Sequence, residues 1–446
     1  MFVLVFVAAV LLAHWYLWNR LVRRTTGPGW VRKTLTWSLV ALLAILVTTF
    51  VGTRMGLESW VAWPGYIWLA LMFYLVVILA VLEIPRAVAL GFLRRAERRE
   101  RAPESVATPV AVPAGAAPSE EPAASGSAAS GSAGSRSAAS GLAGSGSAGS
   151  GFAAFDPAAP EVEAPAAAPM SRRIFLERTT AAIAGVSALG TVGYGLTSAL
   201  GDPVIEPVKV TLPKLDPRLG GLRFAVVSDI HLGPLTGIGH TERIVRMING
   251  LQPDVVAIVG DLVDGSVAQL GALARPLQNL ESRYGAYFVT GNHEYFSPGG
   301  PGEWIEELGE LGVRSLRNER VEIKHQGAVL DLAGVNDVGG AASGDGPDFA
   351  KALGGRDTGR STVLLAHQPV QVDEAARHGV DLQLSGHTHG GQIAPFNLVV
   401  GLQQPVVSGL ATVDGVQVYV TRGAGFWGPP VRVGAPPEIT ILELQS

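Results

Sequence analysis

The sequence predicts an all-α membrane region at the front of the chain and an α/β domain behind it. Apolar residues concentrate in three long stretches near the N-terminus of this 446-residue chain, and the mean hydropathy is +0.29. The C-terminal half instead contains short β-branched runs that are typical of buried strands. Each of these runs is followed by residues that bind metals or carry protons, and the chain has no cysteine.

Three stretches are long enough to cross a membrane, namely Met1–Trp18, Leu35–Gly52 and Gly65–Leu82. A helix rises about 1.5 Å per residue, so each stretch approaches the roughly 30 Å of a hydrocarbon core. Aromatic residues near the ends of these stretches fit the two membrane interfaces. They are Trp15, Tyr16, Trp18, Trp30, Trp60, Trp63 and Tyr66.

Basic residues predict the orientation of these helices. The second connection carries only Arg54 and Glu58, whereas the first is basic without any acid and should therefore be cytoplasmic. The first connection contains Arg20, Arg23, Arg24, Arg32 and Lys33, and the third stretch is followed by Arg86, Arg94, Arg95, Arg98, Arg99 and Arg101. We expect residues 1–101 to form a three-helix anchor of the cell (inner) membrane with a cytoplasmic basic tail. The first stretch lacks a basic start, which favours a membrane helix over a cleaved signal peptide.

Residues 102–170 are dominated by Ala, Gly, Ser and Pro, and they predict a disordered linker. The next segment, residues 171–203, opens with Ser171-Arg172-Arg173-Ile174-Phe175-Leu176-Glu177 and resembles a twin-arginine export signal. The match departs from the usual pattern at Glu177, where a lysine is common. The alternative is a fourth membrane helix with basic flanks. Under either interpretation the domain of residues 204–446 would face the extracytoplasmic side, and the first would make the twin-arginine export machinery a partner.

Five polar blocks follow predicted strands at 224–227, 255–259, 287–289, 363–365 and 382–384. Ligands of α/β sheets gather outside the carboxyl ends of strands, so we expect the blocks to converge on one pocket. Gly260, Gly291 and Gly386 should let the backbone turn tightly there. The blocks are Asp229-Ile230-His231, Gly260-Asp261-Leu262-Val263-Asp264, Gly291-Asn292-His293-Glu294, His367 and Gly386-His387-Thr388-His389.

The chemistry of the blocks predicts a metal site. Carboxylates, imidazoles and a side-chain amide bind ions such as Mn, Fe, Co or Zn, and one carboxylate can bridge two ions about 3.5–4 Å apart. Taken singly, four blocks have structural alternatives. Asp229-Ile230-His231 could be a surface turn, His367 a core histidine, and Asp264 a solvated turn residue or helix cap. His387 and His389 could be two faces of one strand end. The alternatives do not explain why all five blocks stand at strand ends.

Residues from about Pro207 to Leu444 resemble the calcineurin-like metallophosphoesterase superfamily on the strength of these five blocks. Three stretches further resemble its membrane-associated bacterial branch, namely residues 386–392, residues 421–432 and Pro436-Pro437-Glu438-Ile439. The resemblance implies a two-sheet αββα sandwich, an α/β fold. About 240 residues are ample for one such core.

The resemblance also implies a role for each site residue. One divalent ion would be held by Asp229, His231 and His389, and a second by Asn292, His367 and His387. Asp261 would bridge the two ions, with a water or hydroxide between them as the nucleophile. His293 would stabilise the phosphoryl group or protonate the leaving oxygen, with Asp264 orienting its ring; the alternative for Asp264 is a structural turn acid. His240, His325 and His378 are predicted to have surface or packing roles.

We therefore expect metal-dependent hydrolysis of phosphate esters, with phosphodiester or pyrophosphate bonds of lipid or envelope substrates favoured. The alternatives are a soluble nucleotide phosphodiesterase and a non-catalytic, membrane-tethered sensor of a phosphorylated ligand. A net charge of −4 without a basic stripe in the domain argues against nucleic acid as a partner. Phe426 and Trp427 follow a predicted strand at 416–420. We expect them either to contact lipid as an exposed pair or to pack from their loop onto the core of the domain.

Overall fold

The computed structural model describes residues 2–54, 59–100 and 171–446, so the linker predicted at 102–170 lies outside the described residues. Within the described part of the chain, four helical segments are long and apolar enough to cross a membrane. They are Leu4–Arg23, Trp30–Thr53, Ala62–Arg95 and Arg172–Leu200. The second and third contain the stretches predicted from hydropathy at 35–52 and 65–82, and the first overlaps the stretch predicted at 1–18. The last lies within the predicted export signal or fourth helix at 171–203.

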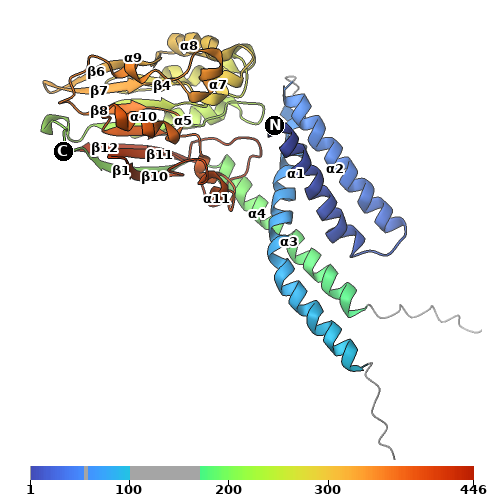
Figure 1. Cartoon of the computed structure of the whole chain (residues 1–446). Coiled ribbons are helices and arrows are strands. Elements are labelled where there is room, and N and C mark those ends of the chain that lie inside the picture. Colours follow the sequence, from blue (N-terminus) through green and yellow to red (C-terminus); the bar gives the residue numbers. More distant parts are fainter. Residues whose placement is uncertain (1, 55–58, 101–170) are drawn as a thin grey trace, which may run out of the picture. The chain divides into compact units, whose positions relative to one another are not determined.

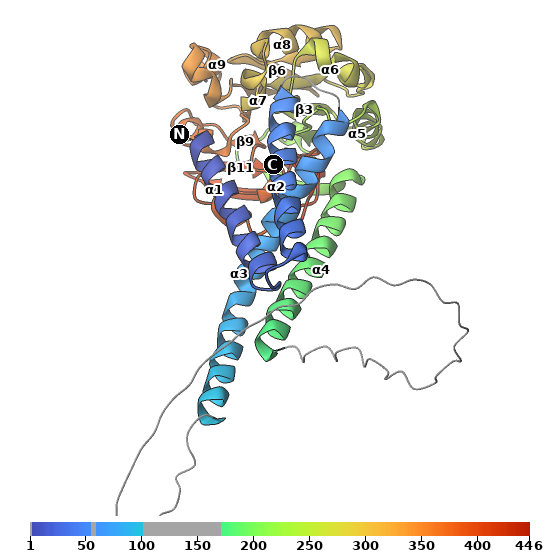
Figure 2. The ribbon, with the colours of Figure 1, turned by 90° about the vertical axis from the view of Figure 1, so that its right-hand side faces the viewer.

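These segments belong to four long helices (Figures 1 and 2), which are α1 (Phe2–Leu17), α2 (Trp30–Arg54), α3 (Ser59–Glu100) and α4 (Arg172–Leu200). A π-helical turn, η1 (Trp18–Arg23), extends α1. Helix α3 runs well past the predicted end at Leu82, because Ala, Leu, Arg and Glu favour a helix whether or not they lie in a membrane. The predicted basic tail is therefore helical up to residue 100.

Helix α4 packs on the other helices through a stripe of small residues. Its buried positions recur every three or four residues, as one helix face requires, and include Thr180, Ala184, Ala188 and Gly195. Small side chains let membrane helices approach closely. Ala184, Ala188 and Val192 accordingly belong to the same apolar cluster as residues of α1, α2 and α3.

A cluster of charges, in which Arg20 and Glu177 are buried, joins three of these elements. The Arg20 guanidinium on η1 lies 2.6 Å from Glu83 of α3 and 3.1 Å from Glu177 of α4. Arg86 of α3 lies 2.6 Å from Glu83 and 2.9 Å from Glu177. Buried charges are costly unless they are paired, so two arginines at this position require two acids. This pairing gives a physical reason for Glu177, where the export-signal pattern has a lysine.

Two six-stranded sheets form the domain, which confirms the two-sheet α/β sandwich that the resemblance implied. The first has the order β1 (Val204–Thr211), β12 (Glu438–Gln445), β2 (Arg223–Val227), β3 (Val255–Val259), β4 (Ala286–Val289), β5 (Val313–Ser315). The second has the order β10 (Gly409–Val413), β11 (Val416–Val420), β9 (Leu382–Ser385), β8 (Thr362–Leu365), β7 (Ala328–Gly334), β6 (Glu319–His325). All five predicted strand runs are confirmed within one residue at each end.

The two sheets face each other across the main core, and helices cover their outer faces. Phe224 and Val226 of β2 point into the core between the sheets, whereas Ala225 and Val227 belong to the layer under the helices. The first sheet is covered by α5 (Ile238–Gly250), α6 (Val267–Ala274) and α8 (Gly300–Glu310), and the second by α9 (Phe349–Leu353) and α10 (Val372–Arg377). This burial on both faces explains why the strands are continuous apolar runs.

Strand direction is what assembles the site. Strands β2, β3 and β4 are parallel, and so are β8 and β9 in the other sheet. Parallel neighbours end at the same edge of a sheet, so the residues after these five strands meet at one edge of the sandwich.

Candidate metal site

The structure brings the predicted metal-site residues together at that edge. Asp229 and His231 follow β2, Asp261 and Asp264 follow β3, and Asn292 begins the short helix α7 (Asn292–Phe296) after β4. His367 follows β8, and His387 and His389 follow β9. Three groups of these side chains could hold a metal ion, each with ligand atoms within 4.8 Å of one another. They are Asp229, His231, His389; Asp261, His367, His387; and His231, Asp261, His293.

The first group is compact and buried. His389 Nε2 lies 3.4 Å from Asp229 Oδ1 and 3.0 Å from His231 Nε2. The Asp229 carboxylate also accepts the backbone N–H of His387, at 2.9 Å. A block after a strand of one sheet is thereby fastened to a block after a strand of the other.

Both histidines of the second group, and also Asn292, which is in none of the three groups, have buried atoms that lack a partner. Asn292 Oδ1, His367 Nε2 and His387 Nδ1 have no hydrogen-bond partner among the described residues, although His367 Nε2 lies 3.2 Å from Asp261 Oδ2. His367 Nδ1 donates to the carbonyl of Val259 at 2.8 Å, which leaves the Nε2 lone pair as the free ligand in the neutral ring. Buried polar atoms normally have partners. These residues therefore fit a divalent cation, which would give each of the three atoms a partner.

Asp264 connects the first group to His293. Its Oδ1 accepts from His293 Nδ1 at 2.7 Å, a contact that the resemblance implied, and from His231 Nδ1 at 2.8 Å, a contact that was not expected. The second nitrogen of His293 points back to the metal groups and lies 4.0 Å from Asp261 Oδ2. One carboxylate oxygen thus orients both a candidate ligand and the candidate acid.

The charges at the site hold protons on two of the rings. Burial disfavours the charged form of His293, but Asp261 and Asp264 outweigh it and raise its pKa to about 9. Burial likewise opposes charge on His367, yet Asp261 raises its pKa above the ordinary value. For Asp264, burial is outweighed by His231 and His293, so its pKa lies below the ordinary value. The carboxylates thus attract positive charge, which protons or metal ions can supply.

The backbone at the site is strained in the way that functional sites often are. Asp229, His231, Asp261, His387 and His389 all have positive φ angles, between 48° and 72°. L-residues other than glycine rarely adopt this left-handed region. Five candidate ligands therefore hold an unfavourable conformation that the surrounding packing must impose.

The glycines in the blocks have two different roles. Gly260 has a φ of +78°, which confirms the tight turn predicted for it. Gly291 and Gly386 do not have positive φ angles, so these two positions do not use the left-handed conformation that glycine allows. They provide room instead: a Cβ on Gly291 would lie 2.2 Å from Asp261 Oδ1, and one on Gly386 would lie 2.0 Å from Ser228 Oγ.

Glu294 is a buried residue to which the sequence analysis gave no role. Its carboxylate accepts the backbone N–H groups of Gly291 at 2.6 Å, Leu262 at 2.8 Å and Asp261 at 3.1 Å. It therefore fixes the loop after β3 to the loop after β4. The signal was present in the sequence, because an acid three residues after Gly291 matches the capping-box pattern at the start of a helix.

Arg432 is a second residue without a predicted role. It is fully buried and donates to the carbonyl groups of Gly425, His389 and Arg422. Its Nη2 also lies 3.0 Å from His389 Nδ1. Because the guanidinium is held in place by these carbonyl groups, it can fix the plane of the His389 ring, a candidate ligand.

The two aromatic residues that were predicted as a pair differ in their exposure to solvent. Trp427 is 54% exposed, and its ring centroid lies 5.9 Å from that of His293. Phe426 is only 4% exposed, so the expectation of an exposed pair is wrong for it. The preceding Gly425 packs tightly against the backbone of Ile230, which draws Phe426 inward.

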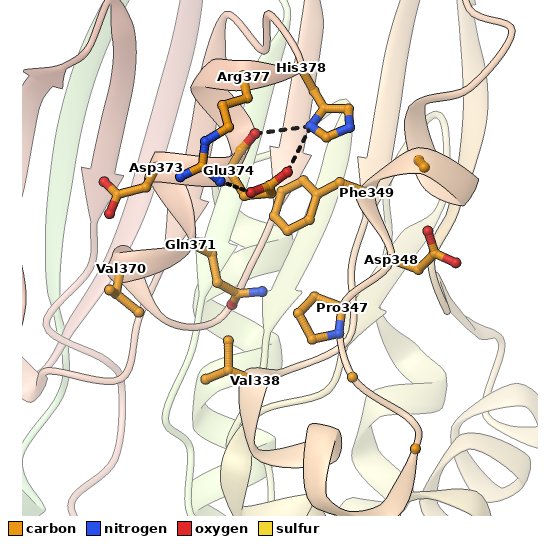
Figure 3. Close-up of a pocket in the computed structure, with 13 residues that line it drawn as sticks. Val338, Pro347, Asp348, Phe349, Val370, Gln371, Asp373, Glu374, Arg377 and His378 are labelled. Atoms are coloured by element: carbon orange, nitrogen blue, oxygen red, sulfur yellow. Dashed lines mark hydrogen bonds and ion pairs between the residues drawn. The ribbon is translucent and has the colours of Figure 1, made fainter.

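The histidines at 240, 325 and 378 have packing roles, as expected. His240 and His325 are buried, and His325 accepts or donates a hydrogen bond at 2.7 Å to the hydroxyl of Tyr284. His378 stacks on Phe349 in an open cleft of about 930 Å³ (Figure 3). None of the nine predicted site residues lines this cleft, so we assign the chemistry to the metal groups and not to it.

Comparisons with known proteins agree with this geometry. Residues 222–391, which span all five blocks, match the family described as calcineurin-like phosphoesterase. A zebrafish (Danio rerio) transmembrane protein with metallophosphoesterase domain is 41% identical over 57% of this chain and 60% of its own length. An uncharacterised metallophosphoesterase of Helicobacter pylori is 40% identical over 57% of this chain and 68% of its own length. One from Aquifex aeolicus is 34% identical over 54% of this chain and 92% of its own.

These matches have clear bounds. The chain covers less than two thirds of the zebrafish relative, and the relatives come from animals as well as bacteria, so the bacterial branch stays a prediction. Among solved structures, a phosphopantetheinyl hydrolase from Mycobacterium tuberculosis aligns at 14% identity with a TM-score of 0.30. It covers 47% of this chain and 91% of that one, and a likeness this low carries no argument about function.

Proposed function

This chain belongs to the calcineurin-like metallophosphoesterase family, and on that premise we propose that its α/β domain hydrolyses phosphate esters with divalent metal ions. The observation that carries the proposal is the set of three buried, unpartnered ligand atoms on Asn292, His367 and His387, beside the Asp261 carboxylate. A protein that only needed a stable core would leave such atoms paired.

We assign two ions to the site. Asp229, His231 and His389 would hold one, and Asn292, His367 and His387 would hold the other, with Asp261 shared. The 3.2 Å between His367 and Asp261 Oδ2 and the 3.9 Å between His231 and the same oxygen support a shared role for that carboxylate. Bound ions of this kind lower the pKa of water and neutralise charge on a phosphoryl group, and Mn, Fe and Zn all suit these ligands.

Within this site, His293 would hold and deliver a proton. Its Nδ1 donates to Asp264, so in the charged ring the second proton sits on Nε2, which faces the metal groups. That proton can stabilise the phosphoryl oxygen or pass to the leaving oxygen. Asp264 would keep the ring in the orientation this transfer needs.

The substrate class we propose is a phosphodiester or pyrophosphate of a lipid or of a lipid-linked envelope precursor. Two exposed rings support it: Trp427 and Phe296 lie 5.9 Å and 5.4 Å from the His293 ring, measured between centroids. A rim of exposed aromatic groups beside a phosphate site suits a substrate with an apolar portion. Four helices capable of crossing a membrane keep the domain near such substrates.

We also propose that α4 is a fourth, retained membrane helix and that the catalytic domain is extracytoplasmic. Arg20, Arg86 and Glu177 meet at one end of the helices, the end that carries the basic connections. That end is expected to be cytoplasmic. Helix α4 starts there, so its C-terminal end and the domain after it would lie outside. The ion pairs of Glu177 favour a helix that stays docked.

The activity is tested with the full chain in detergent, loaded with Mn and assayed against phosphomonoesters, phosphodiesters, nucleotides and phospholipids. We expect Asp261→Asn to abolish hydrolysis and reduce bound metal, because an amide bridges two ions poorly. Activity within about tenfold of the parent would contradict the proposed site, given the rate that a bridging ligand should supply. Binding of a phosphorylated ligand without turnover by the parent chain would instead indicate a sensor.

The topology is tested with a reporter that is active only outside the cytoplasm, fused after Ser446. We expect an active reporter, and an inactive one would overturn the orientation. Replacing Arg172 and Arg173 with lysine then separates two routes. Blocked export would show that the twin-arginine machinery inserts α4, whereas unchanged export would show ordinary insertion of a membrane helix.

A further inference from the structure

An uncharged, apolar segment, residues 395–403, protrudes from the domain directly after the loop that carries His387 and His389. It contains the short helix α11 (Asn397–Val400). Its large side chains face outward: Leu398 is 71% exposed and Leu402 is 83% exposed, with Phe396 and Val399 about half exposed. No charged residue interrupts it. Contiguous exposed apolar surface of this kind usually marks an interaction site.

The residues that flank this segment contact the membrane helices. Ile393 and Val433 pack against the apolar cluster of α1 to α4, and Val431 belongs to that cluster. The Arg432 N–H donates to the carbonyl of Gly195 on α4 at 2.9 Å. At about 1.5 Å per residue, Gly195 lies only about 7.5 Å from the end of α4 at Leu200. The apolar segment therefore begins beside the outer end of a membrane helix.

The exposed Trp427 is joined to the same region. The Gln392 side chain donates to the carbonyl of Trp427 at 2.9 Å and accepts its N–H at 3.0 Å. Tryptophan is enriched where proteins meet the membrane interface. An indole, two leucines and a phenylalanine without any charge are suited to the boundary between lipid headgroups and acyl chains.

We propose that residues 395–403, together with Trp427, are immersed in the outer interface of the membrane. The occupant of this surface is lipid, and the segment is a second contact with the bilayer in addition to the membrane helices. It holds the loop of His387 and His389 at the depth of the headgroups. A further consequence rests on the proposed function: the phosphate esters cleaved would be those of lipids in that leaflet.

The immersion can be measured without any activity. The chain has no cysteine, so Leu398→Cys and Leu402→Cys can each carry a single environment-sensitive fluorophore on the full chain in phosphatidylcholine–phosphatidylglycerol vesicles. We expect a blue-shifted emission that loses most of its intensity when lipids with a nitroxide near the headgroup are included. Lys351→Cys, an exposed position on α9, is the control and should stay unquenched.

Two results would overturn the proposal. Labels at 398 and 402 that behave like the label at 351 would show that the segment stays in water. Blue-shifted labels that lipid nitroxides do not quench would show that protein covers the segment, with a second copy of the chain as the simplest candidate.

An activity measurement tests the consequence separately. Leu398→Ser combined with Leu402→Ser should leave kcat on a small soluble phosphodiester unchanged. On a vesicle-borne phospholipid the same variant should raise the apparent KM by about tenfold, the equivalent of one partly buried leucine. Equal loss on both substrates would contradict the immersion. If the parent chain cleaves neither substrate, the proposed function fails, whereas the fluorescence result still decides the immersion.

Discussion

Replacing Asp264 with alanine should damage metal binding and catalysis together, because one carboxylate oxygen orients two rings. That oxygen lies 2.8 Å from His231 Nδ1 and 2.7 Å from His293 Nδ1. A hydrogen bond to a charged group contributes about 1.5–3 kcal/mol. The Asp264 side chain is 25% exposed, so water replaces part of each bond and the lower end of that range applies.

The loss at His231 then amounts to about 1.5–2 kcal/mol, which corresponds to roughly 10–30-fold weaker metal binding. The loss at His293 should appear in the rate, within the 10²–10⁴-fold or so that a general acid supplies. His293→Ala is the matched control. It should lose the rate alone and keep both metals, since His293 is not among the proposed ligands.

The assay combines calorimetric Mn titration of the metal-free full chain with kcat measured at saturating metal. Asp264→Ala should fall in both measurements, and His293→Ala only in the second. If Asp264→Ala bound metal as tightly as the parent, the contact with His231 would have no orienting role. If His293→Ala lost metal, His293 would be a ligand, as its place in one of the three possible metal groups allows.

Three further predictions follow from buried contacts. Arg432→Lys should weaken metal binding by roughly 10–100-fold, because an ammonium cannot reproduce the fork that fixes His389; unchanged calorimetric affinity would exclude a positioning role. Glu177→Gln should lower the melting temperature of the full chain in detergent, because it leaves two arginines underpaired. A more stable variant would show that the desolvation of this charge cluster outweighs its ion pairs. Phe426→Ser should destabilise the domain by about 3 kcal/mol or more, because it leaves a cavity, whereas Trp427→Ser should not. Equal losses of melting temperature in circular-dichroism melts of the two variants would show that Trp427 is also structural.

The sequence alone determined the strands and the ligand blocks that follow them. A β-branched run, the turn after it and the polar residue beyond are neighbours in the chain, so local patterns reveal them. This is why His367 and the blocks at 229–231, 261–264 and 386–389 could be predicted, and why the direction of parallel strands was enough to expect one pocket. The helices that are long and apolar enough to cross a membrane followed from composition in the same way.

The tertiary structure decided the contacts that join distant parts of the chain. Arg432 reaches His389 across 43 positions, and Arg20 reaches Glu177 across 157. No pattern in the neighbouring sequence reveals such a partner. A charged side chain can be buried only where an opposite charge or a set of carbonyl groups surrounds it, and the sequence does not show which distant residues will lie there. The same reason explains Phe426: its aromatic side chain fits a surface or a core equally well, and only the packing of the loop around Gly425 buried it. Sequence could therefore name the candidate metal ligands, while the residues that hold those side chains in place depended on the fold.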